Sequence, residues 1–210
     1  EYSTYLTQRQ KIQTLKFLYG QLIHPEDDIR RHCAELIGAM IAMFDEDYRK
    51  EIPDSVTLES PAVTGVKLFQ EYMDLFLNPG HKIEENYKAW IGYSTSIMIS
   101  SLFSNCPQKL INDYRQTLLN YYCPENARDK NKALYLLMSV KYIPLWGNGN
   151  LEALYNFVLL LLNKQDDSLR LCAYEEACSL CSNHHVDSKF KKALKDFLRG
   201  KLLRSKLPAE

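Results

Sequence analysis

The sequence has no excess of charge of either sign. Its 210 residues include 26 Lys and Arg and 26 Asp and Glu, which gives a formal net charge of zero at pH 7. A nonspecific binder of nucleic acid or of anionic membranes normally depends on attraction from a net positive charge. The balance therefore disfavours a nucleic-acid partner and leaves only a local basic patch open.

The sequence also lacks a hydrophobic run that would cross a bilayer. Its longest uncharged stretch, residues 89–108, has about the length of a membrane-spanning helix. Polar side chains interrupt this stretch at Ser94, Ser96, Ser100, Ser101, Ser104, Asn105 and Gln108. Because a lipid-facing helix is predominantly apolar all round, the segment predicts a buried helix and no membrane span.

Motifs that would indicate catalysis are missing. The histidines at His24, His32 and His81 form no pattern with acids or cysteines that is typical of hydrolases or metalloenzymes. The loop Gly147-Asn148-Gly149 follows no strand pattern and precedes no Lys, so it is interpreted as a turn and not as a phosphate cradle. The sequence thus predicts no catalytic residue and no cofactor, and it favours a noncatalytic protein.

Cysteine is not scarce, but its pattern does not indicate a disulfide framework. The six thiols are Cys33, Cys106, Cys123, Cys172, Cys178 and Cys181. A chain of this size builds a core without disulfides, so we interpret them as reduced thiols of a cytoplasmic protein. The Cys178-x-x-Cys181 pair with the following histidines has the residue types of a zinc or redox site. All these groups lie at one helix C-terminus, which disfavours a thiolate, so packing is the preferred interpretation and no metal is predicted.

Apolar residues recur at helical spacing along the whole chain, and no segment shows the two-residue alternation of strands. The pattern predicts an all-α protein. Breaks at Pro, Gly and capping residues divide it into antiparallel pairs and one further helix. The predicted pairs cover residues 8–23 with 28–44, 61–77 with 83–103, 107–123 with 128–140 and 151–163 with 167–181, and the last helix covers about 188–203.

Two of the predicted helix starts share one pattern. Each has an acid pair, an aliphatic residue followed by Arg, and then small residues, and each follows an apolar helix. The stretch from Ile29 to Gly38, IRRHCAELIG, resembles the start of the second helix of a HEAT repeat. The stretch from Leu169 to Ala177, LRLCAYEEA, is similar. The helix starts near residues 83 and 129 lack the Arg and depart from the family pattern.

The resemblance implies a right-handed α-α superhelix, a HEAT-like solenoid of about four helical pairs plus a terminal helix. It implies scaffold roles for Asp28, Arg30, Asp167 and Arg170. We expect residues 1–210 to form one solenoid domain. The tail Leu207-Pro208 repeats the pattern of Ile23-His24-Pro25, in which a proline follows the end of a predicted helix. This pattern either indicates a longer array or is a frayed end.

Aromatic residues concentrate in the central pairs and form the candidate partner-binding set. Tyrosine offers a large rigid area with a polar tip, which suits contact with a protein or peptide. The alternative interpretation is packing between helices. The set comprises Tyr87, Trp90, Tyr93, Tyr121, Tyr122, Tyr135, Tyr142 and Trp146.

The last predicted helix is basic on one side and apolar on the other. Its apolar residues include Phe190, Leu194 and Phe197. Such a helix is typical either of a solvated outer face or of a contact with phosphate, an acidic partner or a membrane surface. Its cations are Lys189, Lys191, Lys192, Lys195, Arg199, Lys201, Arg204 and Lys206.

The leading hypothesis is a noncatalytic scaffold or regulatory domain that binds a protein or peptide partner along a concave helical face. HEAT-like folds most often serve this purpose. The alternative is a nucleic-acid-binding protein resembling the HEAT-like DNA glycosylases, which use a basic groove around a flipped nucleotide. The sequence leaves the oligomeric state open.

Overall fold

The computed structural model describes residues 6–44, 64–142, 150–182 and 187–204, with side chains to residue 200. All regular elements in these ranges are helices, which confirms the predicted all-α class for this part of the chain. The chain divides into two compact units, Glu1–Tyr121 and Tyr122–Glu210, which are described separately. The expectation of one solenoid domain stays a prediction.

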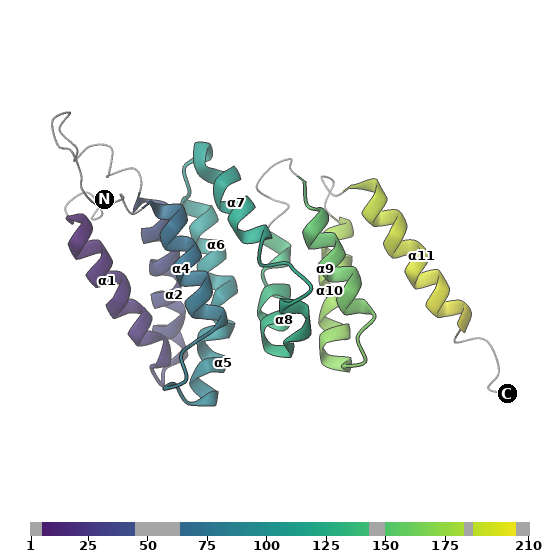
Figure 1. Ribbon diagram of the computed structural model, residues 1–210, viewed down its shortest axis with the longest axis horizontal. Coiled ribbons are helices and arrows are strands. Elements are labelled where there is room, and N and C mark those ends of the chain that lie inside the picture. Colours follow the sequence, from purple (N-terminus) through teal and green to yellow (C-terminus); the bar gives the residue numbers. More distant parts are fainter. Residues whose placement is uncertain (1–5, 45–63, 143–149, 183–186, 205–210) are drawn as a thin grey trace. The chain divides into compact units, whose positions relative to one another are not determined.

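The first unit, coloured purple to teal in Figure 1, contains two short 3-10 helices among its α-helices. Its elements are α1 (Gln8–Gly20), the 3-10 helix Gln21–Ile23, α2 (Asp27–Ala42), α4 (Gly65–Leu77), α5 (Glu85–Tyr93), α6 (Thr95–Asn105), the 3-10 helix Gln108–Leu110 and α7 (Ile111–Leu119). The second unit, green to yellow, contains the 3-10 helix Asn126–Arg128, α8 (Lys130–Leu137), α9 (Glu152–Leu162), α10 (Asp167–Ser182) and α11 (Ser188–Arg204).

Most predicted helices and three of the predicted pairings are observed. Helix α1 packs on α2, α4 on α5 and α6, and α9 on α10. The two helices of the remaining predicted pair, α7 and α8, belong to different units. Helix α4 begins at Gly65, where the Thr64 hydroxyl accepts the Lys67 N–H at 3.2 Å and caps the helix, and the predicted start at Pro61 lies outside the described residues.

The prediction of a single helix over residues 83–103 is wrong, because this stretch forms two helices, α5 and α6, that meet at Ser94. The Ser94 hydroxyl donates a hydrogen bond to the Trp90 carbonyl at 3.0 Å, and its N–H contacts the carbonyls of Trp90 and Ile91. A serine bonded back to the preceding turn bends a helix.

Among the helices of the described ranges, none has both the length and the apolar character needed to cross a membrane.

Close packing of α2 against α6 forms the centre of the first unit. A Cβ atom at Gly38 would lie 2.3 Å from the Met98 carbonyl oxygen and 2.8 Å from the Leu102 nitrogen. The Ser101 hydroxyl donates to the Glu35 carbonyl at 2.6 Å across the same contact. The glycine at position 38 therefore allows close approach by α6 and not by α1, the helix that pairs with α2 in the predicted hairpin.

The two Arg-containing helix starts make the same contact in both units. Arg30 donates to the carbonyls of His24 at 2.6 Å and Pro25 at 2.8 Å and pairs with Asp27 at 2.7 Å. Arg170 donates to the Lys164 carbonyl at 3.2 Å and pairs with Asp167. Each guanidinium thus ties the turn before its helix to the first helical residue.

The acid in this contact differs from the expectation in the first unit. The resemblance implies a scaffold role for Asp28, which pairs with Arg31 at 3.3 Å, whereas Asp27 is the acid that pairs with Arg30. The carboxylate that a helical Arg reaches lies three residues before it, on the same face, and this spacing selects Asp27 for Arg30 and Asp167 for Arg170.

Candidate functional site

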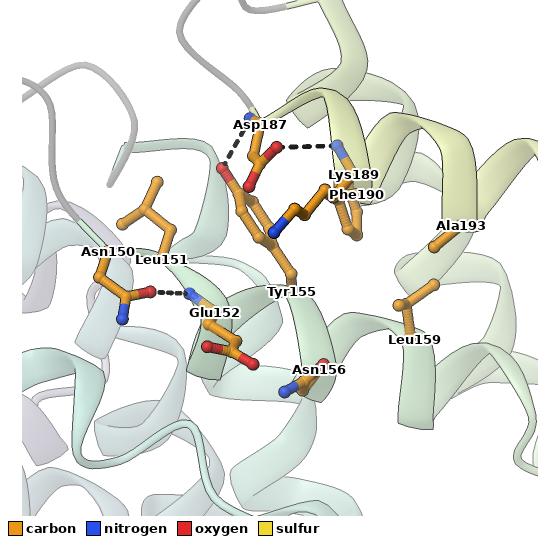
Figure 2. Close-up of a pocket in the computed structure, with 10 residues that line it drawn as sticks. All are labelled: Asn150, Leu151, Glu152, Tyr155, Asn156, Leu159, Asp187, Lys189, Phe190 and Ala193. Carbon is orange, nitrogen blue, oxygen red and sulfur yellow. Dashed lines mark hydrogen bonds between the residues drawn. The ribbon is translucent and has the colours of Figure 1, made fainter.

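A cavity lies in the second unit where α9 and α11 begin. The Asn150 side-chain oxygen accepts the N–H of Glu152, the first residue of α9, at 2.9 Å. The Asp187 carboxylate accepts the N–H of Lys189, near the start of α11, at 2.7 Å. Short polar side chains at these positions accept N–H groups of the first helical turn and so cap the helix. Both helix starts are therefore fixed beside the cavity (Figure 2).

A pair of aromatic rings forms one wall of the cavity. Tyr155 of α9 and Phe190 of α11 stack with ring centres 4.4 Å apart and planes inclined by 18°. Both are buried, with 8% and 3% of their surface exposed. The Asp187 N–H donates to the Tyr155 hydroxyl oxygen at 3.3 Å, so the ring is also held at its polar tip. Burial raises the pKa of Tyr155, which keeps the phenol protonated and able to donate.

The cavity has a volume of about 470 Å³ and a mixed polar and apolar lining. The side-chain ends of Glu152, Asn156 and Lys189 form no hydrogen bond or ion pair with other residues of the described ranges. Figure 2 shows the Lys189 side chain crossing in front of Tyr155. The described lining residues are Asn150, Leu151, Glu152, Tyr155, Asn156, Leu159, Asp187, Lys189, Phe190 and Ala193.

The chemistry of this lining is suited to binding. Its volume lies in the range of ordinary ligand pockets, which combine apolar walls with a few polar groups that orient the ligand. The described lining residues include no serine, cysteine or histidine, and hence none of the commonest nucleophiles paired with a base. What they offer is an aromatic wall, two side-chain amides, one ammonium and two carboxylates.

No protein-family model, no curated protein and no solved structure matches this chain. The HEAT-like resemblance therefore stays a prediction.

The predicted aromatic set is divided between the two units. In the second unit, Tyr122 and Tyr135 are buried, with 3% and 6% of their surface exposed. The Tyr122 hydroxyl donates to the Leu136 carbonyl at 3.1 Å. Tyr142 is half-buried, with the Lys141 ammonium 5.2 Å from its ring centre, and Trp146 lies outside the described residues.

In the first unit, the structure brings part of the aromatic set together on α5. The rings of Tyr87 and Trp90 lie 5.0 Å apart, and the Arg30 guanidinium sits 4.2 Å from the Trp90 ring centre. Tyr93, on the same helix, is 47% exposed. Tyr121 is half-buried and donates to the Gln70 carbonyl and the Asp74 carboxylate at 3.0 and 2.8 Å. These contacts fix the rings of Tyr87 and Trp90 while part of each stays accessible.

Two of the cysteines of α10, Cys172 and Cys181, have environments that disfavour thiolates. Burial, with smaller contributions from the nearby carboxylates of Glu176 and Glu175, raises the pKa of Cys172 to about 11. Burial also raises the pKa of Cys181. A raised pKa reduces the nucleophilic and metal-binding character of these two thiols. Both are half-buried, as the packing interpretation expects, whereas Cys178 is exposed and does not fit it. The histidines that follow this pair lie outside the described residues.

Sequence reasoning did not select the residues of the α9–α11 cavity. Tyr155 falls within the predicted helix over residues 151–163 and Phe190 on the apolar side of the last predicted helix, and neither was marked as a site residue. The available signal was a capping residue, Asn150 or Asp187, followed within about one and a half helical turns by an aromatic residue. That signal occurs twice, but nothing in the sequence pairs its two occurrences in space.

Proposed function

We propose that this chain is a noncatalytic, HEAT-like helical scaffold that binds an extended segment of a partner protein. The observation that carries the proposal is the α9–α11 cavity, with its fixed aromatic wall and its unengaged side chains. Because the wall is already ordered by stacking and by the Asp187 contact, binding loses little conformational freedom in the protein.

The lining complements the groups of an extended peptide. The amides of Asn150 and Asn156 match the donors and acceptors of a peptide backbone. Leu159 and Ala193 provide an apolar surface for one side chain. Only one cation, Lys189, is present among the described lining residues, against two carboxylates, and this composition supports a peptide over the phosphate backbone of a nucleic acid.

The solenoid part of the proposal is supported by the repeated Arg contact. Helical pairs α1–α2 and α9–α10 both place an Arg over the carbonyls of the preceding turn. Recurrence of one local arrangement at two places is typical of repeat proteins. On this basis we propose a right-handed superhelix of about four pairs plus a terminal helix.

The aromatic face of α5 is proposed as a second contact. Trp, Tyr and Arg are the residues that most often dominate the binding energy of protein interfaces. Trp90 already contacts both Tyr87 and Arg30, and the exposed Tyr93 lies on the same helix as the two aromatic residues. The partner role predicted for the whole aromatic set is thus proposed mainly for these residues.

Peptides selected from a random display library on the purified chain test the proposed function. We expect Asn156→Ala and Lys189→Ala each to weaken the selected peptides at least tenfold in calorimetric titrations, because each removes a polar contact in the cavity. The matched controls are Asn120→Ala and Lys192→Ala, which change exposed residues that do not line the cavity and are expected to leave affinity within twofold.

Equal affinity of all four variants would show that the cavity is not the binding site. Selection of no peptide, together with tight and salt-dependent binding of duplex DNA by the same protein, would favour the nucleic-acid alternative instead.

A further inference from the structure

A second cavity of the Tyr122–Glu210 unit lies at the opposite end of α9 and is basic. Its volume is about 450 Å³. One side is the 3-10 helix Asn126–Arg128 with the start of α8, and the other is the turn between α9 and α10. The described lining residues are Ala127, Arg128, Lys130, Asn163, Lys164, Gln165, Asp166 and Leu169.

The walls of this cavity are held in place by contacts within the unit. Ala127 and Leu169 are buried, with 1% and 4% of their surface exposed. The Lys130 ammonium pairs with the Asp166 carboxylate at 2.6 Å and joins the two sides. Arg170 donates to the Lys164 carbonyl at 3.2 Å and fixes the turn that carries Lys164. The cavity is therefore ordered before any ligand enters it.

Positive charge is in excess among the lining residues. Arg128, Lys130 and Lys164 are three cations against one acid, Asp166, which gives a net charge of +2. The Asp166 carboxylate is engaged by Lys130 and by the Leu169 N–H at 3.0 Å. These contacts hold the pKa of Asp166 below its usual range, with the Lys130 hydrogen bond as the largest cause.

The other cations of the cavity remain available. The side chains of Arg128 and Lys164 form no ion pair with any residue of the described ranges. Two acids flank Arg128 in the sequence. Asp129 accepts the N–H groups of Asn131 and Lys132 and caps α8. The pKa of Glu125 is lowered, and the charge of Arg128 is the smallest of the causes.

We propose that this cavity binds the phosphate monoester of a phosphorylated residue in a partner peptide. The peptide part of this inference rests on the proposed function. A phosphate monoester carries a charge of about −1.5 to −2 at neutral pH and so matches the excess charge of the cavity, whereas a carboxylate would neutralise half of it. The Arg128 guanidinium donates two parallel hydrogen bonds to such a group, and the Lys164 ammonium adds a point charge.

The test compares two peptide libraries on the full chain, one with a fixed central phosphoserine and one with serine in its place. We expect the phosphoserine library to be retained at least tenfold better at physiological salt. Arg128→Gln and Lys164→Gln are each expected to reduce this retention at least tenfold. Lys195→Gln, a matched loss of charge on the exposed face of α11, is expected to leave it within twofold.

Titration with inorganic phosphate and with sulfate, followed by NMR, provides a second readout. The second pKa of a phosphate monoester is about 6, and that of inorganic phosphate is similar, so phosphate affinity is expected to fall between pH 7.5 and 5.5 while sulfate affinity stays constant. Resonances of Arg128 and Lys164 are expected to shift with both ions. Unchanged unfolding temperatures of the Gln variants would show that any loss of binding is not a loss of fold.

Equal retention of the two libraries would overturn the phosphate site and leave peptide binding at the α9–α11 cavity intact. Retention of phosphoserine peptides by the double variant Arg128→Gln, Lys164→Gln would also overturn it. Inorganic phosphate binding as tightly as phosphopeptides, or duplex DNA or anionic vesicles binding more tightly through Arg128 and Lys164, would contradict a peptide as the source of the phosphate. Failure of both cavities to bind any peptide would reject the proposed function itself.

Discussion

At the residue scale, Glu176 of α10 is the charged side chain in the described part of the chain that has a buried oxygen without a hydrogen bond. Burial raises the pKa of Glu176, Lys141 opposes the increase and Glu175 adds to it. Because ionisation is harder in the folded chain than in the unfolded one, the folded state binds more protons between the two pKa values. Folding stability contributed by this group is therefore present below the unfolded pKa and is lost as pH rises through the folded pKa.

Glu176→Gln is expected to stabilise the chain at neutral pH by about 1 kcal/mol, the low end of the cost of an unsatisfied buried polar group. The gain is expected to vanish below about pH 4, where Glu is protonated in both states. Urea unfolding midpoints measured between pH 3.5 and 7.5 check this. Glu71→Gln, at an exposed position of α4, is the control and is expected to show no comparable pH dependence. A pH-independent effect of Glu176→Gln would contradict the assignment.

The contacts of individual residues were partly accessible from the sequence. The shared pattern of an acid pair followed by Arg marks Arg30 and Arg170 as corresponding positions, and each donates to a carbonyl of the turn before its helix. Burial of Tyr122 and exposure of Tyr93 could not be predicted from the sequence. Both lie in predicted helical hairpins, but only the partner helices decide that Tyr122 donates to the Leu136 carbonyl inside the core.

At the scale of elements, helix starts with capping side chains were predictable and interruptions were not. Asn150 and Asp187 start α9 and α11 as their residue types indicate. The break at Ser94 depends on a side chain that bonds to its own helix, and serine at most helical positions produces no break. A pattern of apolar residues therefore predicts one helix where two exist.

The close contact between α2 and α6 leads to a stability prediction for a single residue, Gly38. Gly38→Ala places a Cβ against backbone atoms of α6, which cannot rotate away as a side chain can. We expect a loss of about 1–3 kcal/mol in the free energy of unfolding, despite the higher helix propensity of alanine. Urea unfolding measures the loss.

Gly20→Ala is the matched control for this substitution. Gly20 ends α1 with helical backbone angles, and a Cβ there would have open space around it. This variant is expected to be neutral or more stable by up to about 1 kcal/mol. Equal stability of the two alanine variants would show that α2 and α6 do not approach as closely as described.

At the scale of the whole molecule, the two units differ in what they offer a partner. The first presents a fixed aromatic face on α5, and the second contains two cavities at opposite ends of α9. Neither cavity was predictable, because each combines side chains from helices that no sequence pattern pairs with one another. The all-α class and most helix boundaries were predictable, because they depend on spacing and capping within single segments.

Chemical-shift mapping of the 24.5 kDa chain with a library-selected peptide tests the central claim most directly. The claim is that the cavity between α9 and α11 is the peptide site. We expect the largest shifts at the side-chain amide of Asn156, the backbone N–H of Lys189 and the ring of Phe190, and we expect them to saturate with the calorimetric affinity. Saturable peptide binding that leaves these three resonances unchanged would contradict the claim.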